Sequence, residues 1–195
     1  MKPSLEGFNA TLLALTPTLL IAAVTIAGWY VTSAYARIRE DRTRRLTTIL
    51  QYKERQIAEL YGPLLSLIEQ IFNLRRVKQS LLSAENATLS HEARQKVDHY
   101  FWSTQFRPLH SEILELLRKK VYLLEGGATP PSFVAYFQHS VQESVQKELW
   151  DQSQIDTSFL EGKRWPRGFH DDVKSALSRL TSEHQGGLAG LAPEK

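Results

Sequence analysis

Cysteine is absent from the 195 residues of the chain. Without thiols the chain forms neither disulfide bonds nor thiolate metal sites, which fits a reducing compartment. A convincing strand pattern and an internal repeat are also lacking, whereas apolar residues recur at helical spacing along most of the sequence. The sequence therefore predicts an all-α protein.

Charge is absent from Thr11–Val31, a run of 21 residues that suffices to cross a hydrocarbon core about 30 Å thick. Trp29, Tyr30 and Tyr35 stand at one end, where aromatic residues line a membrane interface. We predict a transmembrane helix over residues 11–35, preceded by a short extracytoplasmic N-terminus, 1–10. A cleaved signal peptide is the main alternative and a buried soluble helix is the third, but the weakly charged start of the chain favours an uncleaved anchor.

Positive charge is concentrated directly after this run. The formal net charge is +3, and residues 37–45, with five Arg, one Glu and one Asp, account for all of it. Such a cluster resists translocation, so we expect a bacterial inner-membrane protein with its C-terminal domain in the cytoplasm. The cluster also suits anionic lipid headgroups, and because no aromatic residue is interleaved, nucleic acid is not an expected partner. The predicted membrane-surface residues are Arg37, Arg39, Arg42, Arg44 and Arg45.

A stripe with alternating four- and three-residue steps runs from Leu46 to Leu81 and is apolar at nearly every position. This 3.5-residue period is typical of a helix that packs against other helices. The apolar face is narrow before Gly62-Pro63 and wide after it, which indicates a juxtamembrane stalk at 36–61 and the start of a helical bundle at 62. We predict an oligomer seam at Leu46, Leu50, Ile57 and Leu60.

Gly62 and Pro63 are predicted to form a hinge, because Pro63 cannot donate to the carbonyl of Glu59 and its ring crowds that turn. A simple break between two helices is the alternative. The whole fold is then one transmembrane helix, a long kinked helix and a cytoplasmic bundle of about five helices. The bundle covers residues 62–184 and a flexible tail covers 185–195.

Further helices are expected over 91–106, 108–124, 132–150 and 171–183, with Ser90 as the N-cap of the first. Over 132–150, apolar residues recur at four-residue steps and predict a core-facing stripe. Its members are Phe133, Phe137, Val141, Val145 and Leu149.

Catalytic signatures are lacking: the chain has neither a phosphate-binding glycine loop nor a His-Glu-x-x-His motif. The six histidines are scattered, so we expect them on the surface and expect no catalytic, cofactor or metal site. Three Arg/His pairs have the spacing used by HEPN ribonucleases, in which His acts as acid or base and Arg steadies a phosphate. The pairs are Arg94/His99, Arg164/His170 and Arg179/His184.

Two segments carry a family resemblance. Leu60-Tyr61-Gly62-Pro63-Leu64-Leu65 and Trp165-Pro166-Arg167-Gly168-Phe169 resemble elements of small bacterial proteins that join one N-terminal span to a helical cytoplasmic domain. The layout is also similar to that of the membrane accessory proteins of RNA-targeting CRISPR systems, which pair one anchor with a HEPN-like bundle and assemble into rings.

The leading hypothesis is a non-enzymatic, membrane-anchored helical scaffold or oligomeric effector whose partner is a second copy or another protein. The alternative is a HEPN-like effector that responds to RNA or a nucleotide and is anchored in the membrane.

Overall fold

The computed structural model describes the backbone of residues 5–83, 89–153 and 165–191. It describes the side chains of residues 20–83, 89–126, 128–149 and 165–191. Every regular element in these ranges is a helix, so the predicted all-α class is confirmed. The chain divides into two units, Met1–Ile49 and Leu50–Lys195.

The first unit is helical from Leu5 onward and belongs to α1 (Leu5–Gln56), which continues into the second unit. Its large apolar side chains are exposed: Leu20, Val24 and Trp29 expose 69%, 66% and 70% of their surface. Among the residues that the structure describes, no helix is long and apolar enough to cross a membrane. The predicted transmembrane helix is therefore not supported here, and the side chains of its first nine residues, 11–19, lie outside the described residues.

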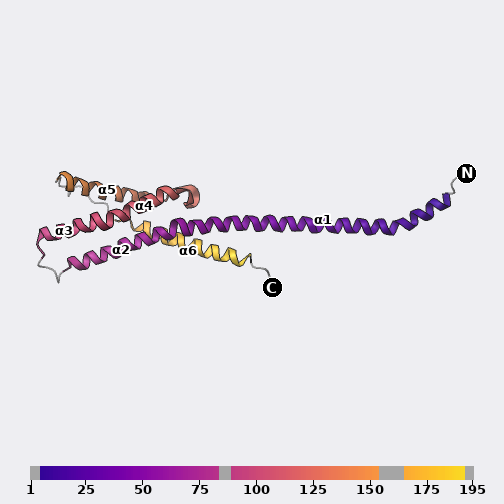
Figure 1. Ribbon diagram of the computed structural model, residues 1–195, viewed down its shortest axis with the longest axis horizontal. Helices are drawn as coiled ribbons and strands as arrows, with labels where there is room; N and C mark the ends of the chain where they lie inside the picture. Colours follow the sequence, from indigo (N-terminus) through magenta and orange to yellow (C-terminus); the bar gives the residue numbers. More distant parts are fainter. Residues whose placement is uncertain (1–4, 84–88, 154–164, 192–195) are drawn as a thin grey trace. The chain divides into compact units, whose positions relative to one another are not determined.

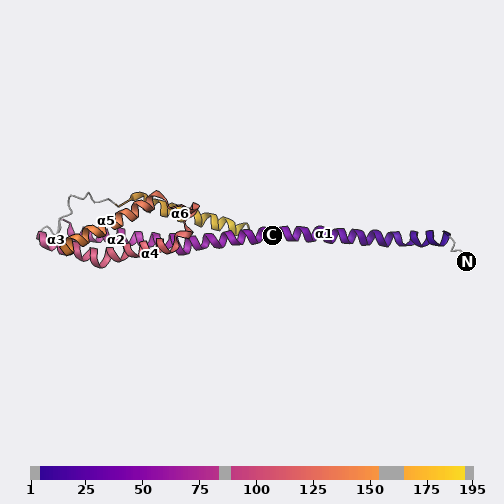
Figure 2. The same cartoon turned by 90° about the horizontal axis from the view of Figure 1, so that it is seen from above.

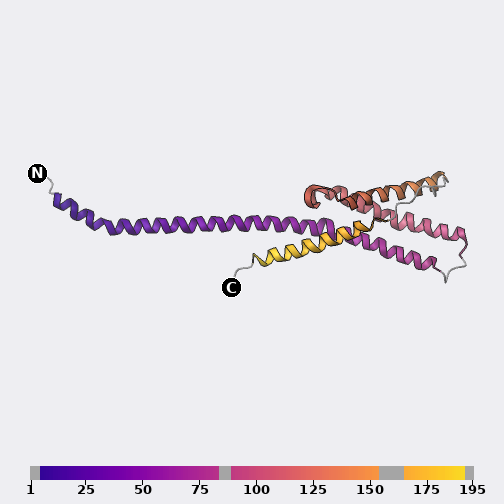
Figure 3. The same ribbon diagram turned by 180° about the vertical axis from the view of Figure 1, so that it is seen from behind.

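The second unit is a helical bundle. A π-helical turn, η1 (Ile57–Tyr61), joins α1 to α2 (Gly62–Leu82) without a break in the helical path (Figure 3). A second π-helical turn, η3 (Trp102–Phe106), joins α3 (His91–Phe101) to α4 (Arg107–Lys120). Two short 3₁₀ turns, η4 (Val121–Leu123) and η5 (Glu125–Gly127), lead to α5 (Pro131–Ser153). The last helix is α6 (Arg167–Ala189).

The two π-helical turns each precede a proline. In η1 the Gly62 N–H donates to the Ile57 carbonyl, five residues back, and Pro63 follows in the first turn of α2. In η3 the Arg107 N–H donates to the Trp102 carbonyl, and Pro108 follows in the first turn of α4. The widened turn accommodates a residue that lacks an N–H, so the helical path continues through Gly62-Pro63 and the alternative of a simple break is wrong. The hinge at Gly62-Pro63 stays a prediction.

The core of the bundle forms where η1 and α2 pack against α4, α5 and α6 (Figure 1). α5 and α6 contact each other near their first turns, where Phe133 and Tyr136 meet Phe169, and Figure 2 shows α6 continuing beyond α5. Three buried side chains on α2 follow helical spacing, Leu64, Ile68 and Ile71, and each exposes at most 1% of its surface. Ile113 on α4 and Phe169 on α6 are fully buried opposite them.

Two helices differ from their predicted bounds or faces. The last helix continues through Gly186 and Gly187 to Ala189, so residues 185–189 are helical rather than a tail. A Cβ at Gly187 would lie 2.4 Å from Leu50 Cδ2, so the absent side chain allows α6 to approach the end of α1 closely. On α5 only Phe133 of the predicted core stripe is fully buried, whereas Val141 and Val145 expose 58% and 46% of their surface. The core-facing prediction is therefore wrong for these two valines.

Candidate functional site

Two histidines and a glutamate meet in the interior of the bundle. His139 and Glu143 are four residues apart on α5, so they lie on one helix face, and His110 reaches them from the first turn of α4. Glu143 Oε2 lies 3.2 Å from His139 Nε2 and 3.8 Å from His110 Nε2. Both histidines expose only 5% of their surface. Three groups that commonly bind metals thus turn their polar atoms toward one another in a largely buried space.

Aromatic side chains hold this cluster in place. The Tyr136 hydroxyl lies 2.9 Å from His110 Nδ1, a hydrogen bond that sets the ring orientation and leaves Nε2 facing Glu143. Tyr136 is fully buried and stacks on Phe169 at 4.2 Å between ring centroids. Trp165 lies edge-on to Tyr136 and His139, with ring centroids 5.4 and 5.6 Å away. The rings of His110 and His139 are therefore packed on several sides, which restricts their movement.

Burial governs the protonation of the cluster. Loss of solvent lowers the pKa of His110 from 6.5 to about 4, so this imidazole is neutral at pH 7. Burial by itself raises the pKa of Glu143, but the approach of His139 and the neighbouring cations, Arg75 among them, outweigh it, and the net pKa is lowered. Burial raises the pKa of the Tyr136 hydroxyl, which stays protonated. The cluster therefore combines a neutral imidazole with an ionised carboxylate.

A cavity of about 270 Å³ connects the cluster with the surface. His110 and Glu143 line it together with Trp102 of η3. Cationic side chains line it as well: Arg75 and Lys78 come from α2, and Lys147 comes from α5. Lys78 is paired with Asp98 at 2.5 Å, whereas among the described residues Arg75 and Lys147 form no ion pair.

A second feature is an apolar stripe on the outside of α5, which we call the α5 stripe and define as Val134, Phe137, Val141 and Val145. Its three valines expose 43%, 58% and 46% of their surface. Gln138, Gln142 and Gln146 stand beside it and are uncharged, whereas Glu148, one turn beyond Val145 on the same face, pairs with Arg107 at 3.0 Å. An exposed apolar surface of this kind is typical of a contact with another protein.

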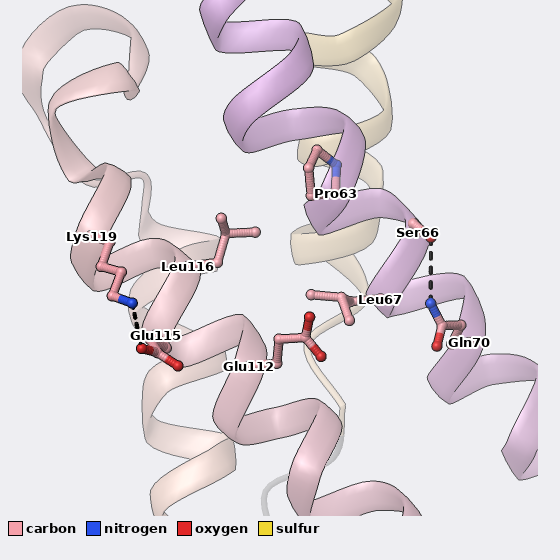
Figure 4. Close-up of a pocket in the computed structure, with 8 residues that line it drawn as sticks. All are labelled: Pro63, Ser66, Leu67, Gln70, Glu112, Glu115, Leu116 and Lys119. Atoms are coloured by element: carbon pink, nitrogen blue, oxygen red, sulfur yellow. Dashed lines mark hydrogen bonds and ion pairs between the residues drawn. The ribbon is translucent and has the colours of Figure 1, made fainter.

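A third feature is a groove of about 340 Å³ between α2 and α4 (Figure 4). Leu67 and Leu116 point into it, and Pro63 lies at its upper end. Two pairs of its polar groups interact within their own helices: Lys119 Nζ lies 2.6 Å from Glu115, and the Gln70 amide donates to the Ser66 hydroxyl at 3.4 Å. The groove holds no cluster of converging polar atoms like that of His110, His139 and Glu143 among the described residues.

The residues of the predicted seam lie at different depths. Leu50 and Leu60 expose 6% and 0% of their surface and pack inside the second unit, and Ile57 is partly buried against the same core. Leu46, in the first unit, is partly exposed. Contact with a second chain through these residues stays a prediction. The five predicted membrane-surface arginines are all exposed on α1, and Arg44 pairs with Glu40 at 2.5 Å.

Two of the three Arg/His pairs lie wholly among the described residues, and neither is arranged to converge on one site. Arg94 and His99 are five residues apart on α3, and Arg179 and His184 have the same separation on α6, so each pair diverges by roughly 140° around its helix. Arg179 instead pairs with Glu125 and Glu183. Arg164 lies outside the described residues, and its partner His170 binds Glu69 at 3.0 Å. The HEPN-like alternative therefore stays a prediction that no contact among the described residues favours.

The sequence reasoning missed His110, His139 and Glu143. One local signal was present, because His139 and Glu143 have the i, i+4 spacing that places two ligands on one helix face. The third member could not be assigned from the sequence, since His110 joins them only when α4 packs against α5. No known protein family, curated protein or solved structure matches the chain.

Proposed function

We propose that the chain is a non-enzymatic, membrane-anchored scaffold whose helical bundle self-associates at the cytoplasmic face of the membrane. The observation that carries this proposal is the α5 stripe, an apolar surface that the helices of the described part of the chain leave exposed. When a partner covers water-exposed valines on one helix face, the free energy falls by about 25 cal/mol for each Å² of apolar surface removed from water.

The proposed membrane anchor is supported by an uncharged run of residues in the first unit, whose described apolar side chains are exposed. Thr11–Val31 holds no charge. Beyond residue 19, Leu20, Ile21 and Val24 expose 69%, 66% and 66% of their surface, which is costly in water and favourable in lipid. The Thr25 and Thr32 hydroxyls donate to carbonyls of their own helix at 2.8 and 2.7 Å, which satisfies these donors without water.

The proposed orientation rests on the arginines that follow the anchor. Arg37, Arg39 and Arg42 are exposed, so they are available to anionic headgroups on the cytoplasmic side. Each contributes about 1 kcal/mol near such a surface. The bundle would then lie on the cytoplasmic side with its α5 stripe accessible to other copies in the same membrane.

A second copy is the occupant that fits the α5 stripe. The stripe and its glutamine flank are uncharged, and Glu148 at one end is paired with Arg107, so two identical faces can meet about a twofold axis with little like-charge repulsion. Anchoring in one membrane also raises the local concentration of copies, which strengthens a modest contact.

Val141→Glu tests the self-association in the full chain, purified in detergent. It should reduce the protein mass measured by light scattering, because it places a charge at the centre of the contact. Val77→Glu is the matched control, since Val77 on α2 is 50% exposed and lies outside the stripe. Equal mass for the wild type and Val141→Glu would contradict the proposal, whether that mass is monomeric or oligomeric.

The anchor has a separate test. The full chain should stay in the membrane fraction after washing with alkaline carbonate, which removes peripheral proteins. Release into the supernatant would contradict the anchor without bearing on self-association.

A further inference from the structure

We propose that His110, His139 and Glu143 bind a divalent transition-metal ion, with zinc as the best match to their chemistry. The site is independent of the proposed self-association, because its residues face the interior and the α5 stripe faces outward. Two imidazoles and one carboxylate form a known zinc ligand set that leaves one coordination position open.

The geometry supports one ion between the three groups. Zinc bonds of about 2.0–2.1 Å in a tetrahedral arrangement place neighbouring ligand atoms about 3.3 Å apart. The separations from Glu143 Oε2 are 3.2 Å to His139 Nε2 and 3.8 Å to His110 Nε2, and all three ligand atoms lie within 4.8 Å of one another. Only small side-chain adjustments are needed to reach the spacing of a metal site.

The hydrogen bonding of the carboxylate is a second observation. Glu143 Oε2 is buried; His139 Nε2 faces it at 3.2 Å, and no hydrogen-bond donor with good geometry meets it among the described residues. A buried carboxylate oxygen without a hydrogen-bond donor is costly, so such an atom in a native protein calls for an ion or another partner. A cation between the three groups supplies that partner.

The surroundings match those of established metal sites. Tyr136 bonds the other ring nitrogen of His110, as second-shell groups do when they orient a histidine ligand. Because His110 Nδ1 is bonded to Tyr136, its Nε2 is the ring nitrogen that faces Glu143. The cavity of about 270 Å³ is lined by Glu143 and His110 and so gives an ion a route to both.

Arg75 works against a cation at this position. It lines the same cavity and its positive charge acts on both His110 and Glu143. A bound cation would therefore be opposed by Arg75, and removal of that charge should strengthen binding. This gives the proposal a gain-of-affinity test, which adventitious binding to surface histidines would not pass.

The experiment is calorimetric titration of Zn²⁺ into the full chain after metal removal. We expect one Zn²⁺ per chain at this site, and we expect Co²⁺ to give the visible absorption bands of a tetrahedral centre. Glu143→Gln should weaken binding by more than about 100-fold, because even loss of a second-shell partner costs about 10–100-fold. Arg75→Gln should tighten binding by about fivefold.

Glu69→Gln is the matched control. Glu69 also pairs with a histidine, His170, but that pair is partly exposed and has no second imidazole. Its removal should leave the affinity unchanged. Circular dichroism checks that each variant is folded, and the wild-type titration decides the question even if Glu143→Gln does not fold. Absence of stoichiometric Zn²⁺ binding by the wild type, or equal weakening by Glu69→Gln and Glu143→Gln, would overturn the proposal.

Discussion

The two π-helical turns both precede a proline, which has no N–H to donate, but they are built from different residues. Each is five residues long and each ends just before a residue-proline pair, Gly62-Pro63 after η1 and Arg107-Pro108 after η3. Both use an N–H to carbonyl bond that reaches back five residues. A proline within a helical path therefore leads here to a widened turn rather than a break.

The turns differ in whether the residue that follows them has room for a Cβ atom. A Cβ at Gly62 would lie 2.8 Å from the Ile57 carbonyl oxygen, a backbone atom that cannot move aside cheaply. The equivalent position after η3 is Arg107, an ordinary L-residue with φ -56° and ψ -47°. The first turn thus requires glycine and the second does not.

The surroundings of the turns also differ. η1 contacts α2, α4 and α6, and its Leu60 and Tyr61 are buried in the core. η3 places Trp102 beside His110, at 5.9 Å between ring centroids, and so forms part of the wall of the metal-site cavity. The first turn supports the core, and the second shapes the proposed site.

The largest expected effect is that of Gly62→Ala. The added Cβ should force the turn apart and reduce the free energy of unfolding by about 1–3 kcal/mol, as overpacking does. Arg107→Ala, at the matched position, should change it by less than about 1 kcal/mol, because its ion pair with Glu148 is exposed. Urea unfolding followed by tryptophan fluorescence measures both, since Trp102 and Trp165 are buried in the bundle. Equal losses of unfolding free energy in the two variants would show that Gly62 has as much room for a side chain as Arg107.

Pro63→Ala and Pro108→Ala should each have a smaller effect. Alanine restores an N–H that can donate to the carbonyl four residues back, but each π-helical turn already positions the chain for a residue without that donor. We expect changes below about 1 kcal/mol in either direction, measured by the same urea titration. Loss of several kcal/mol in Pro63→Ala alone would show that the first turn depends on proline.

The smallest expected difference lies in acid sensitivity. The third residue of η1 is Glu59, whose pKa is lowered by hydrogen bonds from Lys120 and Arg55, at 2.7 and 3.0 Å. A lowered folded-state pKa adds stability above the unfolded value of about 4.3, and that stability is lost as the pH falls through the folded value. The third residue of η3 is Thr104, which does not titrate.

Glu59→Gln should therefore flatten the pH dependence of the urea midpoint below about pH 5, and Thr104→Val should leave its shape unchanged. An unaltered acid profile in Glu59→Gln would show that water screens the ion pairs of η1 completely.

The sequence predicted the secondary structure well because helix periodicity is a local property. The Leu46–Leu81 stripe predicted the continuous path of α1, η1 and α2, and Ser90 was identified as an N-cap, where its hydroxyl accepts the Ala93 N–H at 3.2 Å. The π-helical turns were not predicted, since a missing N–H is equally compatible with a kink, a break or a widened turn. Packing of Leu60 and Tyr61 against the bundle selects among these outcomes.

Side-chain exposure was harder to predict. The four-residue steps on α5 indicate a helix with an apolar face, but they do not say whether another helix covers that face. The Phe133 and Phe169 ring centroids lie 4.9 Å apart, whereas Val141, two turns further along α5, is 58% exposed. The sequence likewise does not predict the close approach of Gly187 to Leu50, because that contact depends on how α6 packs against the end of α1.

By itself, then, the sequence determined the all-α class and the order of the helices, because composition and periodicity act within a few turns of chain. Only the tertiary structure decided that His110 of α4 joins His139 and Glu143 of α5, and that the α5 stripe is left uncovered. The physical reason is that these features depend on contacts between residues about 30 positions or more apart, and such contacts form only when whole helices pack.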